Sequence, residues 1–160
     1  MSASAPLANG LTLQCRAFDR LDNQSLYDLL ALRIAVFCVE QNCAYQDADG
    51  KDALAWHLLA HRHGELVGTA RLLMPGVSYP GACSIGRVAN RADQRGQKIG
   101  QQIMVYAIAQ CEQLFANYPI RLGAQHYLIG FYQQFGFVVQ GERYLEDGIV
   151  HIEMERPAIV

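Results

Sequence analysis

The chain has 160 residues, of which 51% are hydrophobic and 18% charged, and its formal net charge at pH 7 is −2. This is the composition of an ordinary globular domain, without the low hydrophobicity and high charge of a disordered chain. A charge so close to neutral gives no reason to expect nucleic-acid binding or charge-driven binding to a membrane surface.

The length favours a single domain, which we place at residues 11–157, after a flexible lead-in at residues 1–10. The lead-in lacks the basic and apolar segments of a signal peptide. No apolar run approaches the roughly 20 residues that a membrane-spanning helix needs. The five cysteines are odd in number and scattered, which favours reduced thiols and a cytoplasmic location over a disulfide framework.

The first half of the chain alternates between strand and helix patterns. Residues 11–18 place an apolar side chain at every second position, which predicts a strand with one buried face. Residues 22–37 follow a helical period, and residues 38–52 form a long loop rich in Asn, Asp and Gly. Two strands around a turn at His63-Gly64 come next, followed by a short strand at 83–89.

The second half begins with a long helix, predicted from about residue 96 to 117. A strand at 120–124 and a short helix at 127–135 follow. The chain then closes with a hairpin around Asp147-Gly148, a pair that favours left-handed backbone at both turn positions. Helices and antiparallel strand pairs in this order predict an α/β (α+β) domain around one central sheet.

The start of the long helix carries groups that attract an anion. The first N–H groups of a helix have no internal partner, and the helix dipole leaves partial positive charge there. In the segment RGQKIG, Arg95 and Lys98 add full charges, and Gly96 allows close approach to the backbone. The spacing fits neither a dinucleotide fingerprint nor a P-loop. The segment indicates either a phosphate-binding turn or an ordinary polar helix start.

RGQKIG resembles the pyrophosphate-binding turn of the Gcn5-related N-acetyltransferase (GNAT) family, whose pattern is Q/R-x-x-G-x-G/A. Arg95 takes the first position and Gly100 the last, whereas Lys98 departs from the pattern by replacing the middle glycine. A lysine there keeps the backbone N–H and adds an ammonium beside the phosphates.

A second segment, QHYLIGFYQQFGF at residues 125–137, resembles the downstream signature of the same family, N-x-x-A-x-x-L-Y-x-K-x-G-F. Tyr132, Gly136 and Phe137 match the signature, and Gln125 stands for its asparagine. The segments RIAVFCVEQNCAYQDADG, IGRV, LGAQ and YLEDGIVHI further resemble the ElaA-like branch of the family.

The resemblance implies a central mixed, mostly antiparallel sheet with helices on both faces and a splayed pair of parallel strands that binds acetyl-CoA. The pantetheine arm would pair with strand backbone, and the pyrophosphate would reach the start of the long helix. The coenzyme-binding residues implied are Val88, Ala89, Asn90, Arg95, Gly96, Gln97, Lys98, Ile99, Gly100, Gln101, Gln125 and Tyr132.

The implied activity is transfer of an acetyl group from acetyl-CoA to a primary amine, on a small molecule or on a protein N-terminus or lysine, within a ternary complex. The N–H near Val88 would polarise the thioester carbonyl, and Tyr132 would protonate the leaving thiolate. An alternative reading of Tyr132 is a helix aromatic whose hydroxyl lies at the sheet edge. A further alternative for the whole chain is a non-catalytic acyl-CoA sensor or interaction module on the same fold.

The general base is not evident, because Gly86 occupies the position at which many relatives carry a glutamate. We take Glu40 as a tentative base, with the substitutes Asp47, Asp49, His57 and His151. Arg87 is a candidate for binding an acceptor carboxylate or for a structural ion pair. The acidic group of Glu40, Asp47, Asp49 and Asp52 predicts a cationic acceptor such as a polyamine, an amino sugar or a lysine side chain.

The expected partners are acetyl-CoA and an amine acceptor, and no metal, nucleic acid or membrane is expected. Many relatives dimerise, which leaves a homodimer open. A zinc site and a cysteine nucleophile with a histidine partner are weaker alternatives. The residues considered for zinc are Cys38, Cys43, His57, His61 and His63.

Overall fold

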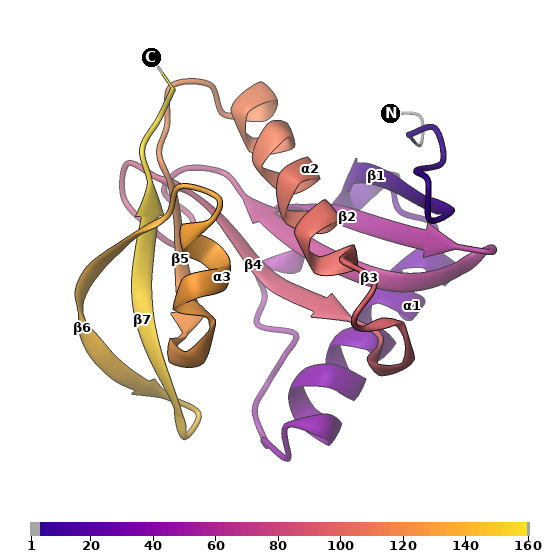
Figure 1. Ribbon diagram of the computed structural model, residues 1–160, viewed down its shortest axis with the longest axis horizontal. Coiled ribbons are helices and arrows are strands. Elements are labelled where there is room, and N and C mark those ends of the chain that lie inside the picture. The colour runs from indigo at the N-terminus through magenta and orange to yellow at the C-terminus, as the bar shows by residue number, and fades with distance from the viewer. Residues whose placement is uncertain (1–3, 160) are drawn as a thin grey trace.

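Seven strands form one mixed sheet in the computed structural model, which describes residues 4–159 (Figure 1). Their order across the sheet is β1-β2-β3-β4-β5-β7-β6; β4 and β5 run parallel, and the other neighbouring pairs are antiparallel. The strands are β1 (Leu11–Ala17), β2 (Ala55–Arg62), β3 (Glu65–Leu73), β4 (Cys83–Asn90), β5 (Ile120–Gln125), β6 (Val138–Glu146) and β7 (Ile149–Arg156). The predicted single mixed sheet is confirmed.

Local sequence signals account for the two hairpin turns. In the β2–β3 turn, His63 and Gly64 have φ values of 52° and 79°, and in the β6–β7 turn Asp147 and Gly148 have φ values of 50° and 77°. Two-residue turns of this left-handed type match the twist of the strands that they join. Both predicted hairpins are therefore confirmed.

Helices cover both faces of the sheet (Figure 1). On one face, α2 (Ile99–Leu114) buries an apolar stripe that includes Ile103 and Met104 in a core shared with Tyr132 of α3 (Ile129–Gln133). On the other face, α1 (Asn23–Arg33) and the π-helical segment that continues it (Ile34–Glu40) pack Leu32 and Val36 against Ala89 of β4.

The long helix begins later than the sequence pattern predicted, at Ile99 rather than near Gly96. Lys98 has φ 60° and ψ 20°, a left-handed conformation that cannot continue a right-handed helix. Residues 95–98 consequently form a loop that leads into the helix, and the Lys98 carbonyl accepts the first helical hydrogen bond, from the Gln102 N–H at 3.1 Å.

β4 and β5 diverge soon after they begin. Their pairing is limited to Cys83 with Ile120 and Ser84 with Arg121. On its other edge, β4 pairs with β3 but contains a bulge between Gly86 and Ala89, where Arg87 has φ 49°. A bulge bends its strand and re-aims the neighbouring side chains, and it is common beside functional sites. The backbone of β4 after Ser84 therefore faces a gap instead of a neighbouring strand.

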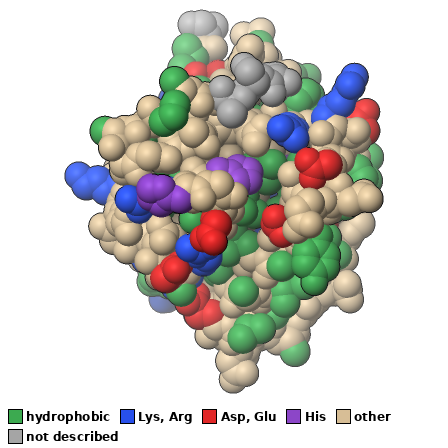
Figure 2. Space-filling view, turned by 90° about the vertical axis from the view of Figure 1, so that its right-hand side faces the viewer, with side chains coloured by type: hydrophobic (Ala, Val, Ile, Leu, Met, Phe, Trp, Pro, Cys, Tyr) green, Lys and Arg blue, Asp and Glu red, His purple; other side chains and the backbone are tan. Residues whose placement is uncertain are grey.

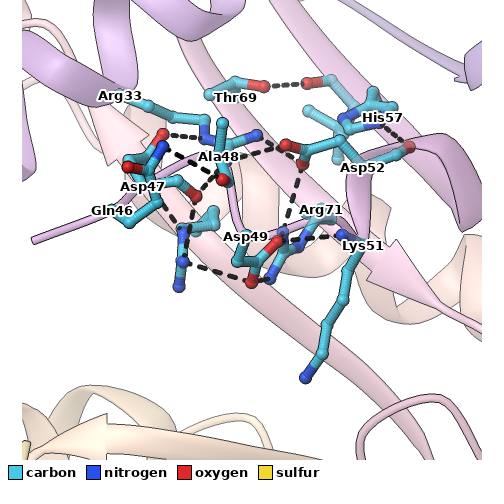
Figure 3. Close-up of polar contacts among 12 residues, drawn as sticks. Arg33, Gln46, Asp47, Ala48, Asp49, Lys51, Asp52, His57, Thr69 and Arg71 are labelled. Atoms are coloured by element: carbon cyan, nitrogen blue, oxygen red, sulfur yellow. Dashed lines mark hydrogen bonds and ion pairs between the residues drawn. The ribbon is translucent and has the colours of Figure 1, made fainter.

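Buried arginines hold the long loop after the π-helical segment. Arg33 of α1 is 1% exposed, and it binds Asp47 through Nε at 2.9 Å and Asp52 through Nη1 at 2.7 Å (Figure 3). Arg71 of β3 binds Asp52 at 3.1 Å and Asp49 at 2.7 Å. A buried charge is tolerated when it is paired and hydrogen-bonded, and these contacts draw the loop against the sheet.

Arg87 of β4 completes this network. Its Nε lies 3.0 Å from Oδ1 of Asp47, and its Nη2 lies 3.3 Å from Oδ2 of Asp49. Three arginines from α1, β3 and β4 thus face three loop aspartates, so the charges balance. We call this set the arginine–aspartate network (Arg33, Asp47, Asp49, Asp52, Arg71 and Arg87).

The predicted flexible lead-in lies only partly within the described residues, because residues 1–3 are outside them. Ser4 donates its N–H to the Leu13 carbonyl at 2.7 Å, and the Leu13 N–H donates to Ser4 Oγ at 2.8 Å. Asn9 donates to Gln102 of α2 at 2.8 Å. The flexibility of the segment stays a prediction.

The surface agrees with the near-neutral charge of the chain. On the face shown in Figure 2, acidic and basic side chains are interspersed rather than gathered by sign. Among the described residues, no helix has both the length and the apolar character required to cross a bilayer.

The core prediction concerns α2. Ile103 is fully buried, whereas Val105 on the opposite side of the helix is 59% exposed. We expect Ile103→Ala to lower the free energy of unfolding by about 3 kcal/mol, because it leaves a cavity under the helix. Val105→Ala should change it by no more than about 0.5 kcal/mol. Urea denaturation of both variants checks this, and equal effects would contradict the assigned helix face.

The network predicts a pH-dependent stability. Burial by itself would raise the pKa of Asp49 and of Asp52, but hydrogen bonds and charge from the arginines outweigh it and hold both pKa values below their ordinary range. The stabilisation is therefore complete about one unit above the unfolded-state pKa of about 3.9, declines as the unfolded state takes up protons, and is lost once the pH has fallen through the folded-state values. We expect the free energy of unfolding, measured in urea, to decline below about pH 5.

Asp52→Asn tests the origin of that decline. At pH 7 it should lower the free energy of unfolding by about 3 kcal/mol, because it unbalances buried arginines. It should also make the decline below pH 5 shallower. The matched control is Asp19→Asn, at an exposed position. If the free energy of unfolding of Asp52→Asn falls with pH below 5 as steeply as that of the unchanged protein, other carboxyl groups cause the decline.

Candidate functional site

A cavity of about 810 Å³ opens where β4 and β5 diverge. Its walls come from the π-helical segment, the long loop, β4, β5, α3 and the β6–β7 hairpin. A smaller cavity of about 280 Å³ adjoins it at the RGQKIG turn, and the two share Asn90, Arg95, Gly100 and Phe131. Volumes in this range hold a small ligand or a cofactor.

The RGQKIG turn has the backbone of a glycine-rich loop although only two of its residues are glycine. Lys98, at the position of the family's middle glycine, adopts the left-handed conformation that glycine adopts most easily. At Gly100, a Cβ atom would lie 2.9 Å from the end of the Asn90 side chain, so a larger residue there would displace Asn90. Lys98 thus adopts in this turn a conformation that a glycine would adopt at lower cost.

The residues of this turn divide between the smaller cavity and the rest of the fold. Gln97 accepts a hydrogen bond from Arg62 of β2. Ile99 is 2% exposed and also belongs to the core. The predicted coenzyme residues that line the smaller cavity are Asn90, Arg95, Gly96, Lys98, Ile99, Gly100 and Gln101.

Asn90 links the end of β4 to the start of α2. With its side-chain amide oriented to satisfy both neighbours, its oxygen accepts from the Gly100 N–H at 3.3 Å and its nitrogen donates to the Ala89 carbonyl at 3.2 Å. Ala89 itself is 2% exposed and packs against α1, so its side chain points away from the cavity. Any contact of Ala89 with a ligand would be made by its backbone.

Arg95 and Glu40 form a two-pronged ion pair beside the cavity. Both Arg95 Nη atoms lie 2.7 Å from Glu40 oxygens, and Nη2 also donates to the Asn90 carbonyl at 3.1 Å. The hydrogen bonds from Arg95 hold the pKa of Glu40 below its ordinary value. A carboxylate in this state is a weak proton acceptor, which weighs against Glu40 as the base.

Tyr132 lines the larger cavity and is 8% exposed. Burial raises its pKa to about 12, so the phenol keeps its proton at neutral pH. The edges of Phe131 and Phe137 pack on its ring at centroid distances of 5.2 and 6.1 Å. A protonated hydroxyl on a fixed ring is suited to donating a proton. Val88, beside the bulge in β4, lines the same cavity.

The other residues predicted for catalysis or acceptor binding are mostly committed to the network. Asp47 is 5% exposed and bound by two arginines. Asp49 and Arg87 line the cavity but are paired with each other. These pairings favour the structural interpretation of Arg87. They also remove the unbalanced negative charge from which a cationic acceptor was predicted.

The two histidines named as substitute bases differ in position. His57 is 1% exposed, its Nε2 lies 2.9 Å from the Asp52 carbonyl, and burial lowers its pKa. His151 of β7 lines the larger cavity, as does Gln125 of β5, which donates to Gln41 at 3.3 Å. Of the two histidines, only His151 is among the residues that line the cavity.

Sequence reasoning missed several residues of the network and of the cavity wall. Arg33 carried a detectable signal, since an arginine on the apolar face of a helix indicates a buried ion pair. The others lie on strands and loops whose neighbours are far away in sequence, and their local patterns do not mark them. The missed residues are Arg33, Lys51, Arg71, Ser78, Tyr79, Tyr144 and Glu146.

The zinc and thiol alternatives find no support in the described part of the chain. Within residues 4–159, no three His, Cys, Asp or Glu side chains are grouped as a metal site requires. Burial raises the pKa of the Cys15 thiol to about 12 and also raises that of Cys43. A hydrogen bond with Cys111 lowers the pKa of Cys83, but Cys83 is fully buried. Thiols with raised pKa values, and thiols out of reach of a substrate, are poor nucleophiles.

Comparison with known proteins matches both the sequence and the fold. Residues 30–157 match the family model described as an acetyltransferase (GNAT) domain. Protein ElaA from Escherichia coli K12 is 45% identical over 141 residues, which cover 87% of this chain and 92% of that protein.

Two solved structures superpose closely. An acyl-CoA N-acyltransferase from Pseudomonas aeruginosa has a TM-score of 0.87 and 43% identity, and E. coli ElaA has a TM-score of 0.85 and 42% identity. Each alignment covers 91% of this chain and 99% of the other. The family match at residues 30–157 includes β4, β5, the RGQKIG turn and Tyr132, and the chain belongs to the GNAT acetyltransferase family as a homologue of ElaA.

Proposed function

We propose that the protein is an N-acetyltransferase that moves the acetyl group of acetyl-CoA to a primary amine in a ternary complex. One observation carries the proposal: the open edge of β4, the RGQKIG turn and the protonated Tyr132 all line two adjoining cavities. A coenzyme with a thioester at one end and a pyrophosphate further along would meet each of them in turn.

The coenzyme fits the two cavities by different interactions. Its pantetheine arm would lie along Val88–Asn90 as an added strand, since β4 lacks a partner there. The pyrophosphate would lie at the start of α2, where helix N–H groups, Gly96 and Lys98 converge. Arg95 would have to release Glu40 to bind the pyrophosphate, because both Nη atoms of its guanidinium already donate to the Glu40 carboxylate.

The chemistry follows from the groups beside the thioester. The amine nitrogen attacks the carbonyl carbon, and the Val88 N–H stabilises the charge that develops on the oxygen. The C–N bond forms as the C–S bond breaks, and Tyr132 donates its proton to the departing thiolate. A non-catalytic acyl-CoA sensor is the second candidate, since Gly86 supplies no base at the position where many relatives carry a glutamate.

The first functional prediction concerns coenzyme affinity. In isothermal titration with acetyl-CoA, the double variant Arg95→Ala, Lys98→Ala should bind at least tenfold more weakly, because it loses both cations of the turn. Glu40→Gln should bind more tightly, because it releases Arg95.

The control for this titration is Arg143→Ala, at an exposed position of β6 outside the cavities. It should bind as the unchanged protein does. Equal affinity in the double variant and the unchanged protein would place the pyrophosphate elsewhere.

The second functional prediction concerns Tyr132. Tyr132→Phe keeps the ring and its packing but removes the acidic proton. We expect kcat for amine acetylation to fall by about a hundredfold or more, while acetyl-CoA affinity changes less than twofold. The rate is measured by quenching the reaction at fixed times and quantifying the released CoA by chromatography. Full activity in the variant would assign the proton to another donor, and absence of activity in the unchanged protein despite binding would support the sensor.

A further inference from the structure

Lys51 differs from the other cations of the larger cavity. Its Nζ lies 2.9 Å from Ser78 Oγ, an uncharged partner. Its backbone N–H is fixed by Asp49 Oδ1 at 3.1 Å, and its side chain extends away from the network (Figure 3). By contrast, the arginines in the cavity wall are bound by carboxylates. Within the described chain, Lys51 is thus the cavity cation that has no carboxylate partner.

His151 and Glu146 form an acceptor pair elsewhere in the wall. His151 is 8% exposed, and its Nδ1 lies 2.8 Å from the Ile149 carbonyl. A carbonyl can only accept, so Nδ1 carries a hydrogen, and in the neutral form of the ring the lone pair is on Nε2. Nε2 lies 3.5 Å from Glu146 Oε2. Two acceptors this close are satisfied together by a group with several protons, such as an amine.

Two tyrosines connect this pair to Lys51. The Tyr144 ring stacks on His151 at a centroid distance of 5.8 Å. A Cβ on Gly123 would lie 2.6 Å from the Tyr144 hydroxyl and 3.9 Å from the Tyr79 hydroxyl, so both hydroxyls lie beside this glycine. Tyr79 adjoins Ser78, the partner of Lys51. The cavity wall therefore has the His151–Glu146 pair at one end, tyrosine hydroxyls in the middle and Lys51 at the other end.

The charges of the cavity wall balance. Its cations are Lys51, Arg71, Arg87 and Arg95, and its acids are Glu40, Asp49, Glu146 and Asp147. A wall without surplus negative charge gives no advantage to a polyamine. A cation and an acid–histidine pair, separated by hydroxyls, are complementary to a molecule that carries both charges.

We propose that the acceptor is a primary amine that also carries an anionic group, with its nitrogen at His151 and Glu146 and its anion at Lys51. This rests on the proposed acetyl transfer. The bound ammonium loses one proton to solvent, and the neutral amine attacks the thioester. Its second proton passes to His151 Nε2 as the amide forms, and Tyr132 protonates the thiolate. Solvent then restores both residues.

The test compares matched amines at saturating acetyl-CoA, with released CoA measured by chromatography. The probes are ω-amino acids of two to six carbons, aminoalkyl phosphates of the same lengths, alkylamines and α,ω-diamines. We expect kcat/KM to be at least tenfold higher for an anionic amine than for the alkylamine and the diamine of equal length. Comparing the ω-amino acids with the aminoalkyl phosphates shows whether the site prefers a carboxylate or a phosphate. Equal or better turnover of the uncharged or dicationic amines overturns the inference, as does turnover of none of the anionic ones.

Variants localise the effect. Lys51→Gln should raise KM for the anionic amine about tenfold with little change in kcat, and Lys51→Glu should shift the preference toward the diamine. His151→Gln should lower kcat instead. The control is Arg143→Gln, an exposed cation outside the cavity, which should change neither constant. An unchanged KM in Lys51→Gln overturns the assignment of the anion site.

Titration with acetyl-CoA distinguishes failure of the acceptor inference from failure of the proposed function. If the unchanged protein binds acetyl-CoA and acetylates amines without preference for anions, the acceptor inference fails and the proposed function stands. If it binds no acetyl-CoA, the proposed function itself fails.

Discussion

The arginine–aspartate network is the constraint on which the site depends. Arg33 and Arg71 are almost fully buried, and a buried guanidinium without a carboxylate would be strongly destabilising. The loop after the π-helical segment supplies the three aspartates, so it is bound to a helix on one side and to two strands on the other. That loop forms one wall of the cavity. Its position is therefore set by the electrostatics of the core and not by its own sequence pattern.

Strand divergence provides the second element of the site. Because β4 and β5 pair only at their first residues, the backbone beyond Ser84 is available to a ligand. The bulge at Arg87 and the left-handed residue Lys98 shape the two ends of this opening. Backbone groups recognise a ligand largely independently of side-chain identity. Lys98 adopts a left-handed conformation and so leaves the backbone in a shape that glycine commonly provides.

The cavity combines two kinds of charge arrangement. At the RGQKIG turn, Arg95 and Glu40 neutralise each other, and a phosphate bound there would have to compete with this pair. In the wall between Lys51 and His151, the charges are held apart by hydroxyl groups. Under the proposed function, the first arrangement would make coenzyme binding an exchange of ion pairs, and the second would offer separate positions to the two ends of an acceptor.

The sequence by itself determined the order of the elements, both hairpin turns and the apolar stripe of α2, because periodicity and turn chemistry act between residues close in the chain. Its resemblance to the family pointed to Tyr132 and the RGQKIG turn, which line the two cavities. Only the tertiary structure decided that the loop aspartates form ion pairs with buried arginines and that Glu40 forms an ion pair with Arg95. It also decided that Lys51 and His151 line the same cavity. These relations join residues 14 to 100 positions apart, and ion pairing and cavity shape depend on distances that folding alone sets.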